Sequence, residues 1–347
     1  MTAVLCRSRV VLRNRLLIRC CYCTDPKDTL GPPTRFWRYT VNKFTYVVEK
    51  YEQKLEKKSP KAFNVYKTIK SIRYIASDTK DYFSVTKDIW AGRELHTFTR
   101  RELEIYQDMQ KDMWKIVSLL VLATIPVIGN AFVVIGYMFP KRLFTHHLWN
   151  EAQKEEFGQY YLTTRLTHYH NVLEHLDKQV YKISKKEAQQ NLLDILHKLQ
   201  TSQHPTVDEV LQVKSFFSKY PLSIEELPTL YIRQLGKIIG DTERRYHLRH
   251  SGLILLHIDR AMVREGIENM TDQDICKACL KRGLNPYGLV KEERVQFLRT
   301  WTDITKELDE TNVSLLFHCP VFLTYNKQTN ITLMKGKRYL WRRKQGK

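Results

Sequence analysis

The 347-residue sequence contains few of the patterns that mark enzymes and metal sites. Its 13 glycines are scattered and form no phosphate-binding loop. No nucleophile, base and acid stand in a recognisable catalytic order, no Asp-x-Asp-x-x-Gly calcium loop occurs, and no His-Glu-x-x-His zinc motif occurs. We therefore expect a protein that is not an enzyme and that needs no cofactor and no small-molecule substrate.

Cysteine is scarce in the part of the chain that could form a core. Of the seven cysteines, four lie between Cys6 and Cys23, and the remaining three do not form a disulfide framework. Cys276 and Cys279 form a lone C-x-x-C, and no second ligand pair stands at a spacing that suits zinc. We interpret both as ordinary helix residues, with Cys279 on the packed face.

Acidic residues are absent from residues 1–23, which contain five arginines among apolar side chains. The arginines interrupt the apolar run too often for a secretory signal. An Arg-rich, acid-free, amphipathic start is typical of a mitochondrial presequence (transit peptide), which we predict over residues 1–23. A basic tail without a targeting role is the alternative.

Charged residues are absent from one long segment, residues 116–139. A helix of that length covers about 36 Å, compared with about 30 Å for the hydrocarbon core of a bilayer. We predict a single transmembrane helix from Ile116 to Phe139, kinked at Pro126, where Asn130 is within reach of the carbonyl group that the proline leaves unpaired. The alternative is a buried helical hairpin within a soluble core.

Two sets of residues stand in a recurring order and spacing. The first surrounds the apolar segment and consists of Thr99-Arg100-Arg101-Glu102, Asp112, Lys115, Ile125-Pro126 and Met138-Phe139-Pro140. The second consists of Glu265-Gly266, Ala278-Cys279, Arg282-Gly283, Gly288, Leu298-x-x-Trp301 and Ser314-Leu315-Leu316. Together they resemble the Letm family over roughly residues 95–325, and they are most similar to its short members, which lack long coiled coils and an EF-hand.

This resemblance implies a protein of the mitochondrial inner membrane with a Letm-type ribosome-binding domain, here at residues 140–325. Longer members of the family are held to be cation/proton exchangers. This chain departs from them at Gly129, where the family has an acid, and at Ser118 and Val133, where it has prolines. Because an ion path through lipid normally needs ionisable groups, the departure at Gly129 disfavours transport by this chain alone.

The rest of the chain is predicted to be all-α. Residues 24–115 are predicted to form a helical N-terminal region. It has one helix with an apolar stripe over 36–58 and a second helix that starts at Pro60. Thr99-x-x-Glu102 is a capping-box pattern for the helix that leads to the apolar segment. Apolar residues recur with a period of 3.6 in 151–181, 185–200, 206–219, 223–239 and 241–265. This periodicity predicts a multi-helix bundle. Residues 326–347 form a basic tail that could contact RNA or lipid, or nothing.

The unit from Thr271 to Ile304 is predicted to be the docking element. Thr271 can cap a helix with Asp274 in its first turn, and Gly283 stands where a left-handed residue commonly ends a helix. Ile275, Ala278 and Cys279 should pack inward, as should Leu298 and Trp301 of the next helix. The predicted contacts to ribosomal RNA phosphates are Arg244, Arg245, Arg249, Lys277, Lys281, Arg282, Arg294 and Arg299. A solvated basic face on a protein-binding bundle is the alternative.

The formal net charge of +20 indicates an anionic partner, either RNA or acidic lipid, although a generally basic matrix protein would also carry it. We therefore expect a membrane-anchored mitochondrial protein that docks to ribosomes, to another protein or to itself. Cation/proton transport is one alternative. Nucleic-acid binding through residues 271–304, which resemble SAP-type modules, is another and would fit a nuclear pool. Both flanks of the apolar segment are basic, so orientation is not predicted, and the outer mitochondrial membrane stays an alternative location.

Overall fold

The computed structural model describes residues 62–123, 141, 145, 149, 151–240 and 244–334. Every regular element in these ranges is a helix and none is a strand, so the all-α prediction is confirmed for the described chain. The predicted presequence, the stripe over 36–58, most of the apolar segment and the end of the basic tail from position 335 onward lie outside the described residues.

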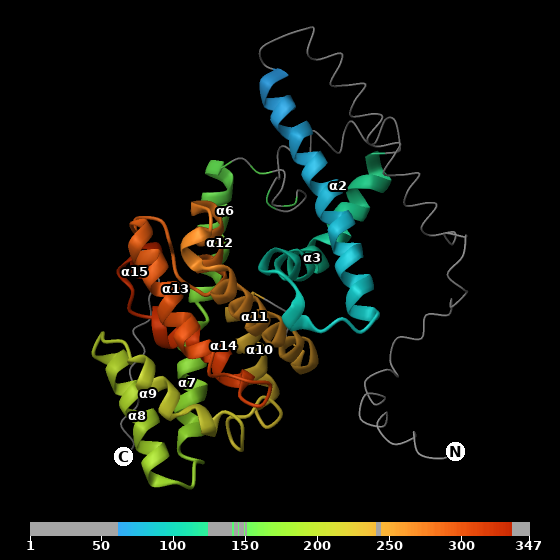
Figure 1. Ribbon diagram of the computed structural model, residues 1–347. Helices are drawn as coiled ribbons and strands as arrows, with labels where there is room; N and C mark the ends of the chain where they lie inside the picture. Colours follow the sequence, from blue (N-terminus) through green and yellow to red (C-terminus); the bar gives the residue numbers. More distant parts are fainter. Residues whose placement is uncertain are drawn as a thin grey trace, which may run out of the picture.

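Figure 1 shows how the helices of the described chain are arranged. In chain order they are α2 (Ala62–Trp90), η2 (Leu95–Thr97), α3 (Arg100–Ala123), α6 (Glu151–Leu166), α7 (Tyr169–Val180), α8 (Lys186–Gln200), α9 (Val207–Gln212), η4 (Lys214–Phe216), α10 (Thr229–Ile239), α11 (Arg245–Glu265), η5 (Ile267–Asn269), α12 (Asp272–Lys281), α13 (Lys291–Thr305), α14 (Val313–Thr324) and α15 (Gln328–Met334).

Helices α6 to α15 form one body, whose centre is α14. All twelve residues of α14 are buried, and the helix packs against α7, α10, α11 and α13. A helix that is apolar on every side is stable in water only when other helices surround it. The packing is close: a Cβ atom added to Gly252 of α11 would lie 2.5 Å from Cζ of Phe317 in α14. A side chain at position 252 would therefore push these two helices apart.

Helices α2 and α3 lie together on one side of this body (blue to teal in Figure 1). Val85 of α2 shares a small core with Leu103 and Tyr106 of α3 and with Ile254 and Ile258 of α11. A second small core joins α2 and α3 alone, through Ile75, Ile105, Met109 and Ile116. Helix α3 therefore packs on α2 along one stripe and on α11 along another.

Several helix boundaries are where local sequence predicts them. Backbone N of Thr99 donates to Oε2 of Glu102 at 2.8 Å and backbone N of Glu102 donates to Oγ1 of Thr99 at 3.3 Å, which confirms the capping box of α3. Backbone N of Asp274 donates to Oγ1 of Thr271 at 3.2 Å, so the cap of α12 is also confirmed. Gly283, just after α12, has a φ of +90°, as its role in ending the helix requires.

Other boundaries differ from the periodicity. The predicted helix over 151–181 is two helices, because the chain turns at Thr167–His168 between α6 and α7. The predicted helix over 223–239 begins only at Thr229, after Pro228, although its buried face starts earlier with Leu222, Ile224 and Leu227. The buried apolar side chains before Thr229 therefore belong to a packed turn, although their spacing in the sequence resembles that of a helix.

Candidate docking site at the junction of α3 and α12

Helix α3 runs from the helical body into the apolar segment, because its bounds, Arg100–Ala123, include the first residues of that segment, 116–123. Ile116, the first residue of the predicted span, is 1% exposed and packs in the small core between α2 and α3. Among the described residues, no helix combines the length and the apolar character that a membrane crossing needs. Pro126, Asn130 and Phe139 lie outside the described residues.

At its N-terminal end, α3 is held by Arg100, whose side chain is 12% exposed. The Arg100 guanidinium lies 2.8 Å from Oε1 of Glu104 and 3.2 Å from Oδ2 of Asp274 in α12. Backbone N of Arg100 donates to Oε1 of Glu265, the last residue of α11, at 2.7 Å. Burial alone would lower the pKa of Arg100, but the carboxylates of Glu104 and Asp274 outweigh it and raise that pKa above its ordinary value.

Further along α3, Asp108 lies between two lysines of α12. Its Oδ2 is 2.9 Å from Nζ of Lys277 and its Oδ1 is 2.7 Å from Nζ of Lys281. Lys277 also lies 3.7 Å from Glu104, and Lys281 donates to the Gln107 side chain at 3.2 Å. Burial and, less strongly, the neighbouring charge of Lys277 lower the pKa of Lys281 although Asp108 opposes this.

These contacts make up the α3 junction, which consists of Arg100, Glu104, Asp108, Glu265, Asp274, Lys277 and Lys281. It contains three cations and four carboxylates, so it is close to neutral and is not a basic surface. A phosphate group could bind Lys281 only by displacing Asp108. The junction therefore joins α3 to the body, and Lys277, 40% exposed, is its lysine with the more accessible side chain.

Arg282 is not on the surface, and the prediction that it is exposed there is wrong. Its side chain is 1% exposed, and both Nε and a terminal nitrogen bond to Oδ1 of Asp259 in α11. Nη1 donates to the carbonyl oxygen of Ala278 at 2.9 Å. Trp301 donates its indole N–H to Oδ2 of Asp259 at 2.8 Å and lies beside the guanidinium. Arg282, Asp259 and Trp301 therefore form a buried polar cluster that joins α11, α12 and α13.

The two predicted contacts on α13 are placed differently from each other. Arg294 is 12% exposed and lies 3.2 Å from Asp272 in α12, so it holds these two helices together. Arg299 pairs with Glu268, and both side chains are more than half exposed. An exposed pair of this kind contributes about 0–1 kcal/mol, so Arg299 can exchange its partner at little cost.

The three predicted contacts at the start of α11 lie at or near the surface. Arg244 is exposed. Arg245 donates to the carbonyl oxygen of Leu227 at 2.5 Å, and Arg249, 43% exposed, lies 3.1 Å from Glu225. The eight predicted residues therefore do not form one basic surface, and the accessible ones are Arg244, Arg249, Lys277 and Arg299.

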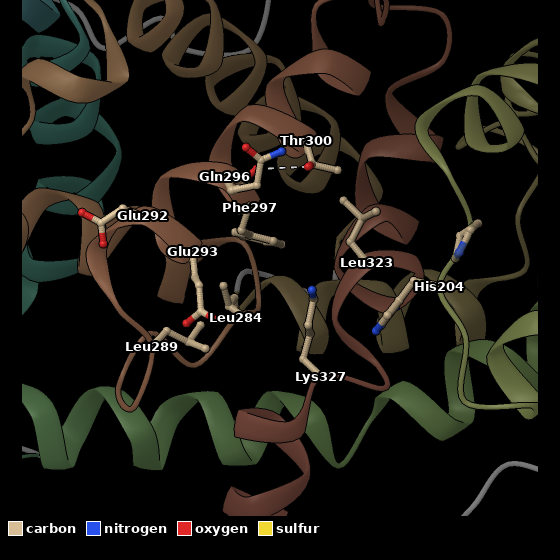
Figure 2. A pocket seen from close by; sticks show the side chains of 11 residues that line it. His204, Leu284, Leu289, Glu292, Glu293, Gln296, Phe297, Thr300, Leu323 and Lys327 are labelled. Carbon is tan, nitrogen blue, oxygen red and sulfur yellow. Dashed lines mark hydrogen bonds between the residues drawn. The ribbon is translucent and has the colours of Figure 1, made fainter.

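A groove of about 540 Å³ lies between the start of α13, the end of α14 and the segment after α8 (Figure 2). Its apolar lining consists of Pro205, Leu284, Leu289, Phe297 and Leu323, and its polar lining of His204, Glu292, Glu293, Gln296, Thr300 and Lys327. Burial lowers the pKa of His204, whose Nδ1 lies 3.1 Å from the Phe322 carbonyl oxygen, so this ring is neutral at neutral pH. None of the eight predicted docking residues lines this groove.

The sequence does not predict the acidic partners that organise these sites. Asp108 and Asp259 lie on exposed-looking helical patterns, and nothing near them in sequence marks their basic partners. Asp259 lies on α11 whereas Arg282 follows α12, and Asp108 lies on α3, far along the chain from Lys277. The one local signal was the Arg100/Glu104 spacing of four, which places both side chains on one helix face.

The comparisons with known proteins agree with one another. A family model described as "LETM1-like, RBD" matches residues 98–322. A protein of Xenopus tropicalis named LETM1 domain-containing protein 1 is 26% identical over 307 residues, which cover 86% of this chain and 88% of that protein. The human protein of that name is 25% identical over 296 residues, covering 83% of this chain and 82% of that protein.

A more distant relative carries a transport name. The Mitochondrial proton/calcium exchanger protein of Drosophila melanogaster is 26% identical over 230 residues, 63% of this chain but 22% of that protein. No solved structure matches the chain. The family match begins beside the cap of α3 and ends within α14, so it includes both sides of the α3 junction.

Proposed function

We propose that this chain, which belongs to the LETM1-like, RBD family, is a membrane-anchored mitochondrial protein that docks its helical body to a partner at the membrane. The mitochondrial ribosome is the candidate partner, because the ribosome-binding domain is what defines the family match. The mitochondrial location is supported by the Arg-rich, acid-free start and by the name of the Drosophila relative.

The observation that carries this proposal is the α3 junction. The chain from Thr124 to Phe139, directly after α3, contains no charged side chain. Ion pairs to α12 and apolar contacts to α11 fix α3 on the body. If the apolar segment continues α3 into a bilayer as a single span, the body is held directly at the membrane surface and not on a loose linker. A partner bound to the body is then held at that surface too.

The accessible cations are the candidate contacts to ribosomal RNA. Arg249, Lys277 and Arg299 are 43%, 40% and 53% exposed, and Arg244 is also exposed. Each can bind a phosphate by giving up at most one or two carboxylate contacts. Binding through phosphates releases counterions, so it should weaken steeply as salt is raised.

The test is co-sedimentation of the full-length protein in mild detergent with mitochondrial ribosomes across a salt series. Arg299→Glu is the test variant and Lys306→Glu is its matched control. Arg299 lies in α13 and Lys306 directly follows it. Their side chains are 53% and 55% exposed, and each is paired with one acid. Arg282→Glu is unsuitable, because it would place an unpaired acid beside Asp259 in the core.

We expect the wild type and Lys306→Glu to co-sediment at low salt and to dissociate as salt rises. Arg299→Glu should bind more weakly and show a salt dependence whose log–log slope is smaller by about 1. If neither salt nor Arg299→Glu changes the association, the contact is not to phosphate. If no association occurs at low salt, the partner is not the ribosome.

Cation exchange is a second candidate function, favoured by the name of the Drosophila relative. The match covers only 22% of that protein, and residues 116–139 of this chain contain no ionisable side chain apart from the Tyr137 phenol. Cation flux in liposomes that contain only this protein, abolished by a single change in residues 116–139, would establish it. Nucleic-acid binding by a SAP-like unit is less well supported, because Arg282 is buried and Lys281 is paired with Asp108.

A further inference from the structure

We propose that the groove beside α13 is the binding site for the C-terminal tail of the same chain, residues 335–347. In this arrangement Tyr339-Leu340-Trp341 occupies the apolar lining and the flanking basic residues face Glu292 and Glu293. This proposal does not depend on the ribosome as partner or on the membrane span.

The lining of the groove selects for an occupant that is both apolar and cationic. Partly exposed Leu289 and the mostly buried Phe297 and Leu323, 7% and 5% exposed, offer a small apolar surface, and exposed Glu292 and Glu293 stand on the α13 side of it. Figure 2 shows Lys327 and His204 on the other side. Two carboxylates against one ammonium and a neutral imidazole leave the lining net negative. A phosphate or a fatty-acid carboxylate would meet repulsion here.

The start of α13 does not favour an anion either. The first turn of this helix already contains two acids, Glu292 and Glu293. Oε2 of Glu293 accepts the backbone N–H of Val290 at 3.1 Å, which is one of the groups that an anion would otherwise use. The carboxylates therefore give this end of the groove a preference for cations.

The tail has the composition that the groove requires. Residues 335–347 contain seven basic residues and no acid. Lys337-Arg338 precede Tyr339-Leu340-Trp341, and Arg342-Arg343-Lys344 follow it. An aromatic and aliphatic core flanked by cations complements an apolar groove with an acidic rim.

The tail also starts close enough to reach the groove. Helix α15 begins next to Lys327, which lines the groove, and its seven residues cover about 10 Å. Five extended residues after Met334 span about 17 Å, so Tyr339 can fold back over the whole of α15. Helix α15 is itself fixed beside the groove. Nδ2 of Asn330 donates to the Gly283 carbonyl oxygen, and Oδ1 accepts backbone N of Asn285, both at 2.8 Å.

Site-specific photo-crosslinking in the full-length protein tests this proposal. Trp341 is replaced by benzoylphenylalanine, the purified protein is irradiated in mild detergent, and the crosslinked peptides are identified by mass spectrometry. We expect an intramolecular crosslink to residues 289–300 or 323–327. Changing Tyr339 and Leu340 to Ser should lower its yield about tenfold or more, and these changes leave the helical body untouched.

A matched pair of charge reversals tests recognition by the rim. Glu292→Lys should lower the crosslink yield about two- to fivefold, the range expected for one exposed ion pair. Glu310→Lys, an equal change at another exposed glutamate, should leave the yield unchanged. A crosslink that maps outside the groove, or a yield that Glu292→Lys does not change, overturns the proposal. A crosslink between two copies of the chain also overturns it, in favour of a tail that binds a neighbouring molecule.

Discussion

Replacing Arg282 with Met should lower the free energy of unfolding of the helical body by about 3–5 kcal/mol, the usual cost of leaving one member of a buried ion pair alone. Asp259 would stay 1% exposed, and of its partners only the indole N–H of Trp301 would remain. The Ala278 carbonyl oxygen would also lose a donor. Methionine is shorter than arginine but has a similar volume, so the loss comes mainly from the missing charge and hydrogen bonds and not from a large cavity.

The exposed pair on α13 is the control for this substitution. Arg299→Met removes the same guanidinium from a partner carboxylate, Glu268, but both side chains are more than half exposed. Water can solvate Glu268 when Arg299 is absent, so this change should cost at most about 1 kcal/mol. The two substitutions therefore differ in burial and not in chemistry.

Pulse proteolysis of the full-length protein across a urea series measures both changes. The midpoint for Arg282→Met should fall well below that of Arg299→Met. The double change Asp259→Leu with Arg282→Met should recover part of the loss, because no charge is then left buried. If Arg282→Met costs no more than Arg299→Met, the buried cluster does not hold α11, α12 and α13 together as we argue.

Three further predictions concern other parts of the chain. Gly283→Ala should destabilise the protein by more than about 1 kcal/mol in the same urea assay, because φ is +90° there and a Cβ would clash with the Tyr169 hydroxyl. Burial lowers the pKa of His318 to about 4, so the unfolded chain binds more protons between about pH 6.5 and pH 4. The free energy of unfolding should therefore be highest above pH 6.5 and fall by about 3 kcal/mol as pH drops through that window. For His318→Gln the free energy of unfolding should depend less on pH. Alkaline carbonate should leave the wild type in the membrane pellet and release more of Val127→Arg, since an arginine in mid-span costs about 2.5–3.5 kcal/mol on insertion scales. Release of the wild type would instead favour a buried hairpin.

The parts of the fold that the sequence predicts correctly depend on residues within one or two helical turns. The caps at Thr99 and Thr271 need only a hydroxyl and the turn that follows it. The end of α12 at Gly283 needs only a residue that accepts a positive φ. The burial of Ile275, Ala278 and Cys279 follows from the helical period, and it is confirmed.

The candidate site depends on contacts that no local pattern contains. Lys281 and Arg282 are neighbours in sequence and have the same charge, yet one reaches Asp108 of α3 and the other reaches Asp259 of α11. The partner of each residue depends on how α12 is rotated relative to α3 and α11, and that rotation is not encoded in a local pattern. The residues that line the groove come from separate segments between His204 and Lys327, so no single stretch of sequence predicts its apolar lining.

If this chain holds mitochondrial ribosomes at a membrane, as we propose, the fraction of those ribosomes that sediments with mitochondrial membranes should depend on it. The fraction is compared in cells that lack the chain and in cells that express the wild type, Lys306→Glu or Arg299→Glu. We predict that loss of the chain lowers the fraction, that the wild type and Lys306→Glu restore it, and that Arg299→Glu restores it only in part. An unchanged fraction in cells without the chain would show that this chain does not hold the ribosomes at the membrane.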